Sequence, residues 1–267
     1  MIQYDQPEPH LSQLVPYCVG FLTSGRDEYG NGLVPCGSGV FIEVNGWKGV
    51  LTAAHVLEAL EQSDRCGLML FNEKARKAPN LEFNGNSILR SKKIGPSGTA
   101  EGPDLAVFQL PSDIEGWVAS KALFYNFDKR LELASEEGPS LPYEILVGMM
   151  KERSENKSVG DDRRTDTHSL SLVYGDAEAY KPTEIADLFD FRCNHSEDVP
   201  APRESYGGFS GSPIWMVATE PGVNNFFLKG IAFFESDVKD DGSRHLVCHG
   251  PSSVWKLVPL MVQDLKG

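Results

Sequence analysis

The sequence has no long apolar run. None of its 267 residues lies in an apolar stretch approaching the roughly 18 residues that a membrane-crossing helix needs. The N-terminal residues contain neither a basic segment nor an apolar one, so they do not resemble a secretory signal peptide. We therefore expect a cytoplasmic protein that does not bind a membrane.

Cysteines and basic residues are also few. The five cysteines are odd in number and scattered and include no C-x-x-C pair, so they indicate neither a disulfide framework nor a zinc site. The chain has 25 Lys and Arg residues against 38 Asp and Glu residues, and its net charge of −13 would repel the phosphates of a nucleic acid. The turn Gly37-Ser38-Gly39 leads into a strand, so it is not a phosphate-binding loop. We expect no nucleic-acid partner, no metal and no organic cofactor.

Helical periodicity is scarce too, and the apolar runs are short. With 26 Gly and 17 Pro residues the chain is rich in turns, and two β-forming runs flank Asn45-Gly46, the strongest short-range hairpin signal. Further strands are predicted at Leu14–Leu22, Gly67–Phe71, Leu105–Leu110, Tyr143–Met149, Leu170–Tyr174, Pro213–Val217, Phe226–Phe234 and His245–Cys248, and helices at Val56–Gln62, Pro182–Asp190 and Val254–Leu265. This pattern predicts an all-β sandwich or barrel.

Polar segments divide the chain. The length corresponds to a little under two domains. The composition around Asp128–Pro142 indicates a linker between two halves. Lys151–Asp166 is highly charged and Phe191–Glu204 is rich in Asp, Asn and Pro, so both are predicted to be loops.

One histidine follows a run of small residues, in Leu51-Thr52-Ala53-Ala54-His55. Small residues allow a neighbouring backbone to approach closely, and His55 stands where a predicted strand gives way to a helical turn. A general base needs such a position, at the edge of a packed scaffold and within reach of substrate. Taken alone, a purely structural histidine is the commoner explanation.

Asp104 opens the predicted strand Leu105–Leu110 and follows Gly102-Pro103. Gly-Pro-Asp is typical of a turn, which is the simpler explanation of this residue. The functional alternative is a partly buried carboxylate that holds an imidazole in one tautomer.

Ser210 lies between glycines in Gly207-Gly208-Phe209-Ser210-Gly211-Ser212-Pro213, directly before a predicted strand. Glycines permit unusual backbone angles, which lets neighbouring N–H groups point outward together. Two such groups beside a hydroxyl nucleophile form an oxyanion hole. A plain β-turn is the alternative.

Together the three patterns resemble the trypsin/chymotrypsin-like serine protease family, in particular its bacterial-type intracellular members. The order His, Asp, Ser is the order of that family and differs from that of subtilisins and α/β-hydrolases. The separations of about 50 and about 105 residues are of the family's size, and the resemblance covers the chain from about Val19 to Leu265.

The resemblance implies two antiparallel six-stranded Greek-key β-barrels with the active site in the cleft between them. Residues 1–130 would form the first barrel, carrying His55 and Asp104, and residues 131–267 the second, carrying Ser210 and a C-terminal helix. It also implies a serine endopeptidase that acts on protein or peptide substrates through an acyl-enzyme intermediate.

Roles follow from the resemblance residue by residue. Ser210 would be the nucleophile, His55 the general base and acid, and Asp104 the orienting carboxylate. The N–H groups of Gly208 and Ser210 would bind the developing oxyanion.

Two departures from the family pattern are informative. Secreted members often pair a Cys just before the His hairpin with one just after the His; Cys36 matches the first position, but Val56 occupies the second. Zymogens of the digestive type place an Asp directly before the nucleophile, where it binds a newly cut N-terminus, and here that position is Phe209. We therefore expect activity without N-terminal cleavage.

Two questions stay open. The same fold could serve as a catalytically silent peptide-binding module, or as one that an unidentified partner activates. For the substrate pocket, Glu204 lies six residues before the nucleophile and would favour basic side chains, unless it is an ordinary loop residue neutralised by Arg203. His249 is the competing pocket residue and would favour acidic ones.

Overall fold

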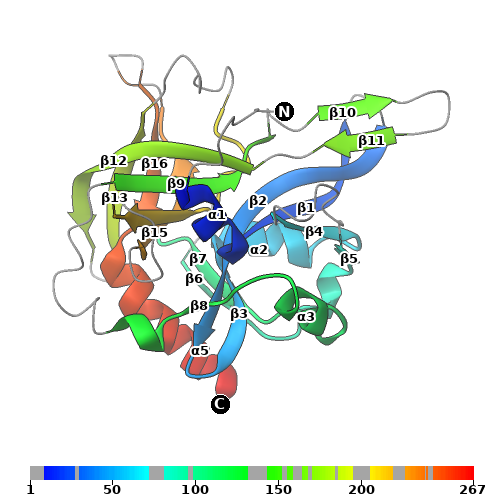
Figure 1. Ribbon diagram of the computed structural model, residues 1–267, viewed down its shortest axis with the longest axis horizontal. Coiled ribbons are helices and arrows are strands. Elements are labelled where there is room, and N and C mark those ends of the chain that lie inside the picture. Colours follow the sequence, from blue (N-terminus) through cyan, green and yellow to red (C-terminus); the bar gives the residue numbers. More distant parts are fainter. Residues whose placement is uncertain are drawn as a thin grey trace.

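The computed structural model describes residues 9–27, 30–71, 81–95, 99–131, 143–151, 155–158, 164–167, 170–183, 186–194, 205–218, 226–237, 239 and 243–267. Most of this part of the chain is β-strand, arranged as an N-terminal half and a C-terminal half that lie against each other (Figure 1). None of the helices described is long and apolar enough to cross a membrane.

The N-terminal half, residues 9–131, is built around an eight-stranded sheet. Its path runs β5-β4-β1-β2-β3-β7-β6 with antiparallel neighbours, and the short β8 pairs in parallel with β2. The strands are β1 (Cys18–Asp27), β2 (Gly30–Val44), β3 (Trp47–Thr52), β4 (Cys66–Leu70), β5 (Leu81–Phe83), β6 (Ser91–Ile94), β7 (Leu105–Phe108) and β8 (Tyr125–Asn126). The β2–β3 turn is the predicted Asn45-Gly46 hairpin, with φ of +49° and +75°.

Three short helices accompany this sheet: α1 (Pro9–Leu14), α2 (Ala54–Glu61) and α3 (Ser112–Ala119). Helix α2 begins two residues after β3 ends and buries Val56, Leu57 and Leu60 completely. This apolar stripe recurs at helical spacing and holds α2 against the sheet. Residue 55 is thereby fixed in the first turn of a packed helix.

The C-terminal half contains a closed antiparallel barrel of six strands in the order β12-β13-β16-β15-β14-β9. The strands are β9 (Tyr143–Met149), β12 (Leu170–Pro182), β13 (Asp187–Cys193), β14 (Pro213–Val217), β15 (Phe226–Glu235) and β16 (His245–His249). Large apolar side chains fill its interior, among them Phe189, Phe191 and Phe209. Closure leaves this sheet without a free edge.

Two elements extend beyond the barrel. β10 (Glu155–Ser158) and β11 (Arg164–Thr167) pair as a separate two-stranded antiparallel sheet that projects at the upper right of Figure 1. The chain ends with a π-helical turn over Ser253–Leu257 and helix α5 (Val258–Lys266). Helix α5 leaves the barrel and packs on β6 and β7, where Lys92 Nζ lies 2.8 Å from Asp264 Oδ2 (Figure 1).

An aromatic cluster joins the two halves. Tyr125 of β8 packs edge-on against Trp215 of β14, with ring centroids 5.1 Å apart. The Tyr125 hydroxyl accepts the N–H of Leu228, and Trp255 Nε1 donates to the carbonyl of the same residue. Since all these side chains are buried, the halves share one apolar core that resists relative movement.

The expected all-β class, the barrel and the C-terminal helix are confirmed, and several finer expectations are not. The turn expected at Gly37-Ser38-Gly39 lies within β2, and the loop expected over Phe191–Glu204 begins inside β13. β5 and β6, at the two ends of the N-terminal sheet, do not pair within the described residues, so a second six-stranded barrel is not confirmed. The helix predicted over Pro182–Asp190 is wrong, because β12 extends to Pro182 and β13 begins at Asp187. The loop predicted over Lys151–Asp166 contains β10 and most of β11; both are polar, so no alternation of apolar residues marks them.

Candidate functional site

His55 is the second residue of α2 and is held from two sides by one carboxylate. Its backbone N–H donates to Asp104 Oδ1 at 3.0 Å, and its Nδ1 lies 2.7 Å from Asp104 Oδ2. The helix has no capping side chain of its own, so Asp104 serves as its cap. The preceding residues, Ala53 and Ala54, are completely buried and bring this turn close to the sheet.

Asp104 lies directly before β7 and its side chain has no exposed surface, whereas that of His55 is 29% exposed. A carboxylate accepts hydrogen bonds only, so the neutral form of the His55 ring has its proton on Nδ1 and a lone pair on Nε2. The two bonds also fix the plane of the ring. The sequence patterns around residues 55 and 104 therefore meet in one hydrogen-bonded pair.

A second histidine lies behind this pair. His249, the last residue of β16, is completely buried, and its Nε2 accepts the backbone N–H of Asp104 at 2.9 Å. Its ring packs against Phe233 with centroids 4.7 Å apart. Burial lowers the pKa of His249 to about 4, and the nearby Asp104 and Asp187 carboxylates only partly oppose this shift. The ring is therefore neutral near pH 7.

Ser210 lies in a tight turn that precedes β14. Gly208 and Gly211 have φ of +95° and +83°, left-handed values that favour glycine. Within the turn, the N–H of Phe209 donates to the carbonyl of Tyr206 and that of Ser212 donates to the carbonyl of Phe209. The turn is tied to β15 through the N–H of Gly211, which donates to the carbonyl of Ala232 at 2.7 Å.

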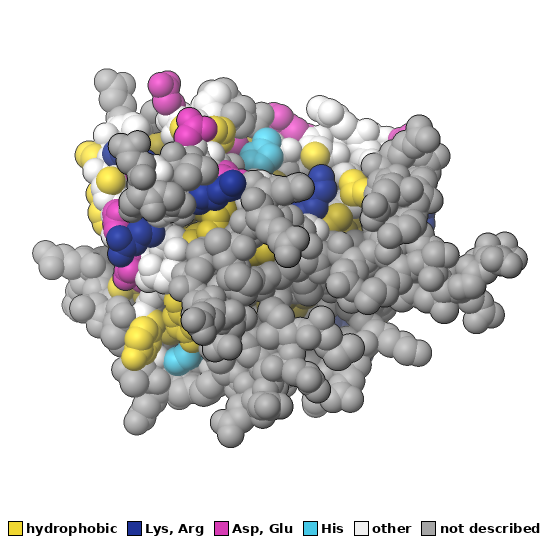
Figure 2. Space-filling view, turned by 90° about the horizontal axis from the view of Figure 1, so that it is seen from above, with side chains coloured by type: hydrophobic (Ala, Val, Ile, Leu, Met, Phe, Trp, Pro, Cys, Tyr) yellow, Lys and Arg dark blue, Asp and Glu magenta, His cyan; other side chains and the backbone are white. Residues whose placement is uncertain are grey.

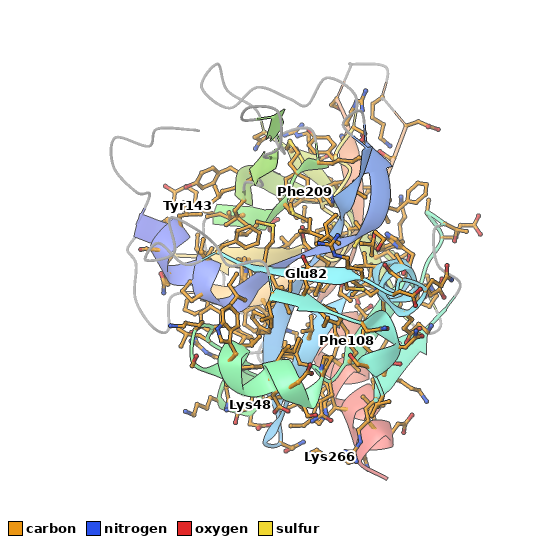
Figure 3. All side chains as sticks on the ribbon, turned by 90° about the vertical axis from the view of Figure 1, so that its right-hand side faces the viewer. Lys48, Glu82, Phe108, Tyr143, Phe209 and Lys266 are labelled. Carbon is orange, nitrogen blue, oxygen red and sulfur yellow. The ribbon has the colours of Figure 1, made fainter. Side chains whose placement is uncertain are left out.

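Phe209 anchors this turn in the barrel. It is completely buried and its ring lies 6.0 Å from that of Tyr206. Figure 3 shows Phe209 among the ribbons of the C-terminal barrel, whereas Phe108 lies lower, with the N-terminal sheet. A buried apolar side chain, and not a carboxylate, thus occupies the position directly before Ser210.

Glycines let the Ser210 turn approach the scaffold of His55 closely. A Cβ atom placed on Gly37 would lie 2.5 Å from Val56 Cγ2 and 3.0 Å from the carbonyl oxygen of Ser210. A Cβ atom on Gly211 would lie 2.1 Å from Thr52 Oγ1. The structure therefore brings Ser210 beside the β3–α2 junction that carries His55, although the two side chains form no hydrogen bond with each other.

Two N–H groups beside Ser210 are available to bind an anion. The carbonyl of Gly207 accepts the N–H of Lys151 at 2.7 Å. The Gly207–Gly208 peptide is trans, so the N–H of Gly208 points away from Lys151. Among the residues described, the N–H groups of Gly208 and Ser210 have no hydrogen-bond acceptor.

The two candidate pocket residues differ in outcome. Glu204 lies outside the described residues. His249 is described, and its complete burial behind Asp104 places it out of contact with solvent. Within the described chain, no group of three His, Cys, Asp or Glu side chains is arranged to hold a metal ion.

The surface of the molecule carries charges of both signs. Basic, acidic and hydrophobic side chains of the described residues are intermixed on the face drawn in Figure 2. Surface ion pairs of the described residues include Arg65–Glu82, whose Nη2 and Oε1 atoms lie 2.7 Å apart. Contacts of this kind contribute little to stability, which leaves the buried core as the main stabilising feature.

Sequence comparison adds no family assignment. No protein-family model matches the chain, and none of the curated proteins is significantly similar to it. The functional argument therefore depends on the residues and contacts described above.

Proposed function

We propose that the chain is a serine endopeptidase of the trypsin/chymotrypsin-like kind, with Ser210 as nucleophile, His55 as general base and acid, and Asp104 as orienting carboxylate. The observation that carries the proposal is the contact of 2.7 Å between His55 Nδ1 and the fully buried Asp104 Oδ2. This contact prepares Nε2 of His55 to accept a proton. The two-barrel architecture of that family is part of the same proposal.

The first half of the reaction forms the acyl-enzyme. Ser210 Oγ attacks the carbonyl carbon of the scissile peptide while His55 Nε2 takes the hydroxyl proton. The carbonyl oxygen becomes negatively charged, and the N–H groups of Gly208 and Ser210 stabilise it. The C–N bond then breaks, and the leaving amine receives the proton from His55.

The second half releases the product. A water molecule attacks the ester carbonyl and gives a proton to His55 Nε2, and that proton returns to Ser210 Oγ when the C–O bond of the ester breaks. Asp104 stays ionised throughout and stabilises the imidazolium form of His55. No N-terminal cleavage is required, because the buried Phe209 replaces the carboxylate that such activation uses.

A fluorophosphonate probe tests the proposal directly. We expect the purified wild-type chain to be labelled once, on Ser210, and Ser210→Ala to remain unlabelled. The matched control is Ser171→Ala, a fully buried serine in β12 whose Oγ has no hydrogen-bond partner within the described structure. Labelling of Ser210→Ala equal to that of the wild type would contradict the assignment of the nucleophile.

One observation favours a second candidate, a peptide-binding module on the same fold that is silent or activated by a partner. His55 and Ser210 form no hydrogen bond in the described structure, although such bonds often tighten only when substrate binds. A folded wild-type chain that binds peptides but never reacts with the probe would support a silent module. Labelling that appears only after peptide addition would support activation.

A further inference from the structure

Ser38 occupies an unusual position for a serine without an assigned role. It lies in β2, on the N-terminal half, and has no exposed surface. Its backbone N–H donates to the carbonyl of Ser210 at 2.7 Å. Its own carbonyl accepts Thr52 Oγ1 at 2.6 Å. The backbone of one residue thus connects the Ser210 turn to the end of β3, three residues before His55.

The side chain of Ser38 makes two more bonds. Oγ donates to the carbonyl of Gly208 at 2.9 Å and accepts the N–H of Met149 at 2.8 Å. A hydroxyl has one proton to donate, and here that proton goes to Gly208. The hydroxyl therefore joins the Ser210 turn to the end of β9, and both of these elements belong to the C-terminal half.

These bonds contribute to the direction of the Ser210 N–H, together with the N–H of Ser212, which donates to the carbonyl of Phe209. The Ser210 N–H belongs to the Phe209–Ser210 peptide, which lies between two peptides whose carbonyl groups Ser38 holds, those of Gly208 and Ser210. Met149 lies two residues before Lys151, whose N–H binds the carbonyl of Gly207 and so directs the N–H of Gly208. Ser38 therefore supports the orientation of both N–H groups: that of Ser210 through the two neighbouring peptides, and that of Gly208 through Met149 and the nearby Lys151.

We propose that Ser38 is a positioning residue that holds the N–H groups of Gly208 and Ser210 in the orientation needed to bind an oxyanion. The inference rests on the proposed function, because it assigns a purpose to these two groups. Ser38 does not touch the reacting atoms. It acts through the turn and couples the half that carries Ser210 to the half that carries His55.

Removal of the hydroxyl should reduce turnover more than substrate binding. Ser38→Ala leaves the buried N–H of Met149 and the carbonyl of Gly208 without this partner, so the turn can rotate away from its native orientation. Loss of one oxyanion donor typically costs a factor of 10² to 10³ in kcat. We expect partial misalignment to lower kcat about 10- to 100-fold while KM changes by less than about two-fold.

The experiment compares Ser38→Ala, Ser38→Cys and the control Ser171→Ala with the wild type. Hydrolysis of a peptide substrate gives kcat and KM, and amide hydrogen exchange is measured over residues 205–212. Ser38→Cys keeps a weak donor at the same place, so it should recover part of kcat and remain measurable where Ser38→Ala does not fold. The proposal would be overturned if folded Ser38→Ala had the kcat of the wild type. It would also be overturned if KM rose 10- to 100-fold while kcat stayed unchanged.

The exchange measurement separates this inference from the proposed function. If wild-type protein never reacts with the fluorophosphonate probe, the protease proposal fails whatever Ser38 does. Faster exchange over residues 205–212 in Ser38→Ala than in Ser171→Ala would still support the positioning role. Equal exchange in the two variants would overturn that role, even in an active enzyme.

Discussion

The two halves of the molecule prepare their parts of the candidate site in different ways. In the N-terminal half, the side chains of His55 and Asp104 contact each other directly, and each lies next to an end of regular structure. In the C-terminal half, Ser210 lies in a turn whose backbone is hydrogen-bonded to Lys151, to β15 and to β2, and which also accepts the hydroxyl of Ser38. The first arrangement depends on which side chains are present, and the second depends mainly on the conformation that the backbone adopts.

This difference predicts two kinds of mutational effect. Changes at His55, or the conservative Asp104→Asn, should remove chemistry and largely preserve the fold, because the apolar side chains of α2 stay packed and the Asn amide oxygen can still accept the N–H of His55 that Asp104 caps. Changes in the turn should disturb the fold and the chemistry together. Neighbouring backbone atoms lie so close to its glycines that an added Cβ would clash with them.

The largest effect is expected for His55→Ala. The variant lacks the group that accepts the hydroxyl proton of Ser210, so peptide hydrolysis should fall about 10⁴-fold or more. The variant should stay folded with a somewhat lower melting temperature, since the fully buried Asp104 loses one partner but keeps the backbone N–H of residue 55. Hydrolysis within ten-fold of the wild type, in a preparation of verified purity, would exclude His55 as the base.

Asp104→Asn should lower hydrolysis by about 10³- to 10⁴-fold. The amide keeps the shape of the carboxylate, but its NH₂ group favours an imidazole with the proton on Nε2, the wrong tautomer for a base. A pH profile of kcat/KM for the variant and the wild type provides the measurement. If both profiles coincide, Asp104 has no role in orienting His55.

Gly211→Ala tests the backbone-dependent half. Its φ of +83° strains any other residue, and the new Cβ would lie 2.0 Å from the carbonyl oxygen of Ser38. We expect the free energy of unfolding to fall by about 4 kcal/mol, as measured by urea denaturation. The control is Gly116→Ala in α3, where a Cβ meets no atom within 4 Å and should stabilise the helix slightly.

The contrast also explains which features the sequence predicts. The Asn45-Gly46 hairpin and most strands depend on residues close together in the chain, and local patterns report such features well. The contact between His55 and Asp104 joins residues 49 positions apart, and only the resemblance to a protease family predicts it. The sequence does not predict the contacts of Ser38, because its partners at residues 149 and 208 lie more than 100 positions away. Its Gly-Ser-Gly surroundings carry only the signal of a turn into a strand.

The burial of His249 is not predicted by the sequence for the same reason. Two histidines in one strand, at positions 245 and 249, give no indication of which one contacts Asp104. The predicted helix at Pro182–Asp190 failed because pairing of β13 with β16 overrides the local preference of its first residues. Long-range pairing of this kind leaves no mark in a short window of sequence.

His249 should make the free energy of unfolding depend on pH. Its pKa of about 4 in the folded chain lies below the ordinary histidine value of 6.5, so between these values the unfolded chain binds the additional proton. Stability should therefore fall by about 3 kcal/mol as the pH decreases from about 6.5 to about 4, and this contribution should change no further below that.

His249→Gln isolates this contribution. The amide oxygen of Gln can still accept the N–H of Asp104 but does not titrate in this range. Urea denaturation at several pH values should give a shallower decrease for the variant than for the wild type. Parallel curves for the two proteins would show that His249 does not stay neutral in the folded chain.

The smallest effect is expected for Thr52→Val, which removes only the hydrogen bond from Oγ1 to the carbonyl of Ser38. Both residues are completely buried, and a net hydrogen bond contributes about 1 kcal/mol, so the free energy of unfolding should fall by about 1–2 kcal/mol. Kinetics should change less than in Ser38→Ala, because Thr52 does not touch the Ser210 turn through a hydrogen bond.

The double variant Thr52→Val, Ser38→Ala tests whether the two halves of the molecule are coupled through Ser38. If Ser38 couples β3 to the Ser210 turn, both substitutions weaken the same connection. The double variant should then lose less stability than the sum of the losses in the two single variants. The combination of Thr52→Val with the exposed Gly116→Ala, which shares no partner with it, should be additive. Additivity within about 0.3 kcal/mol for the Ser38 pair as well would mean that the two halves hold their parts of the site independently.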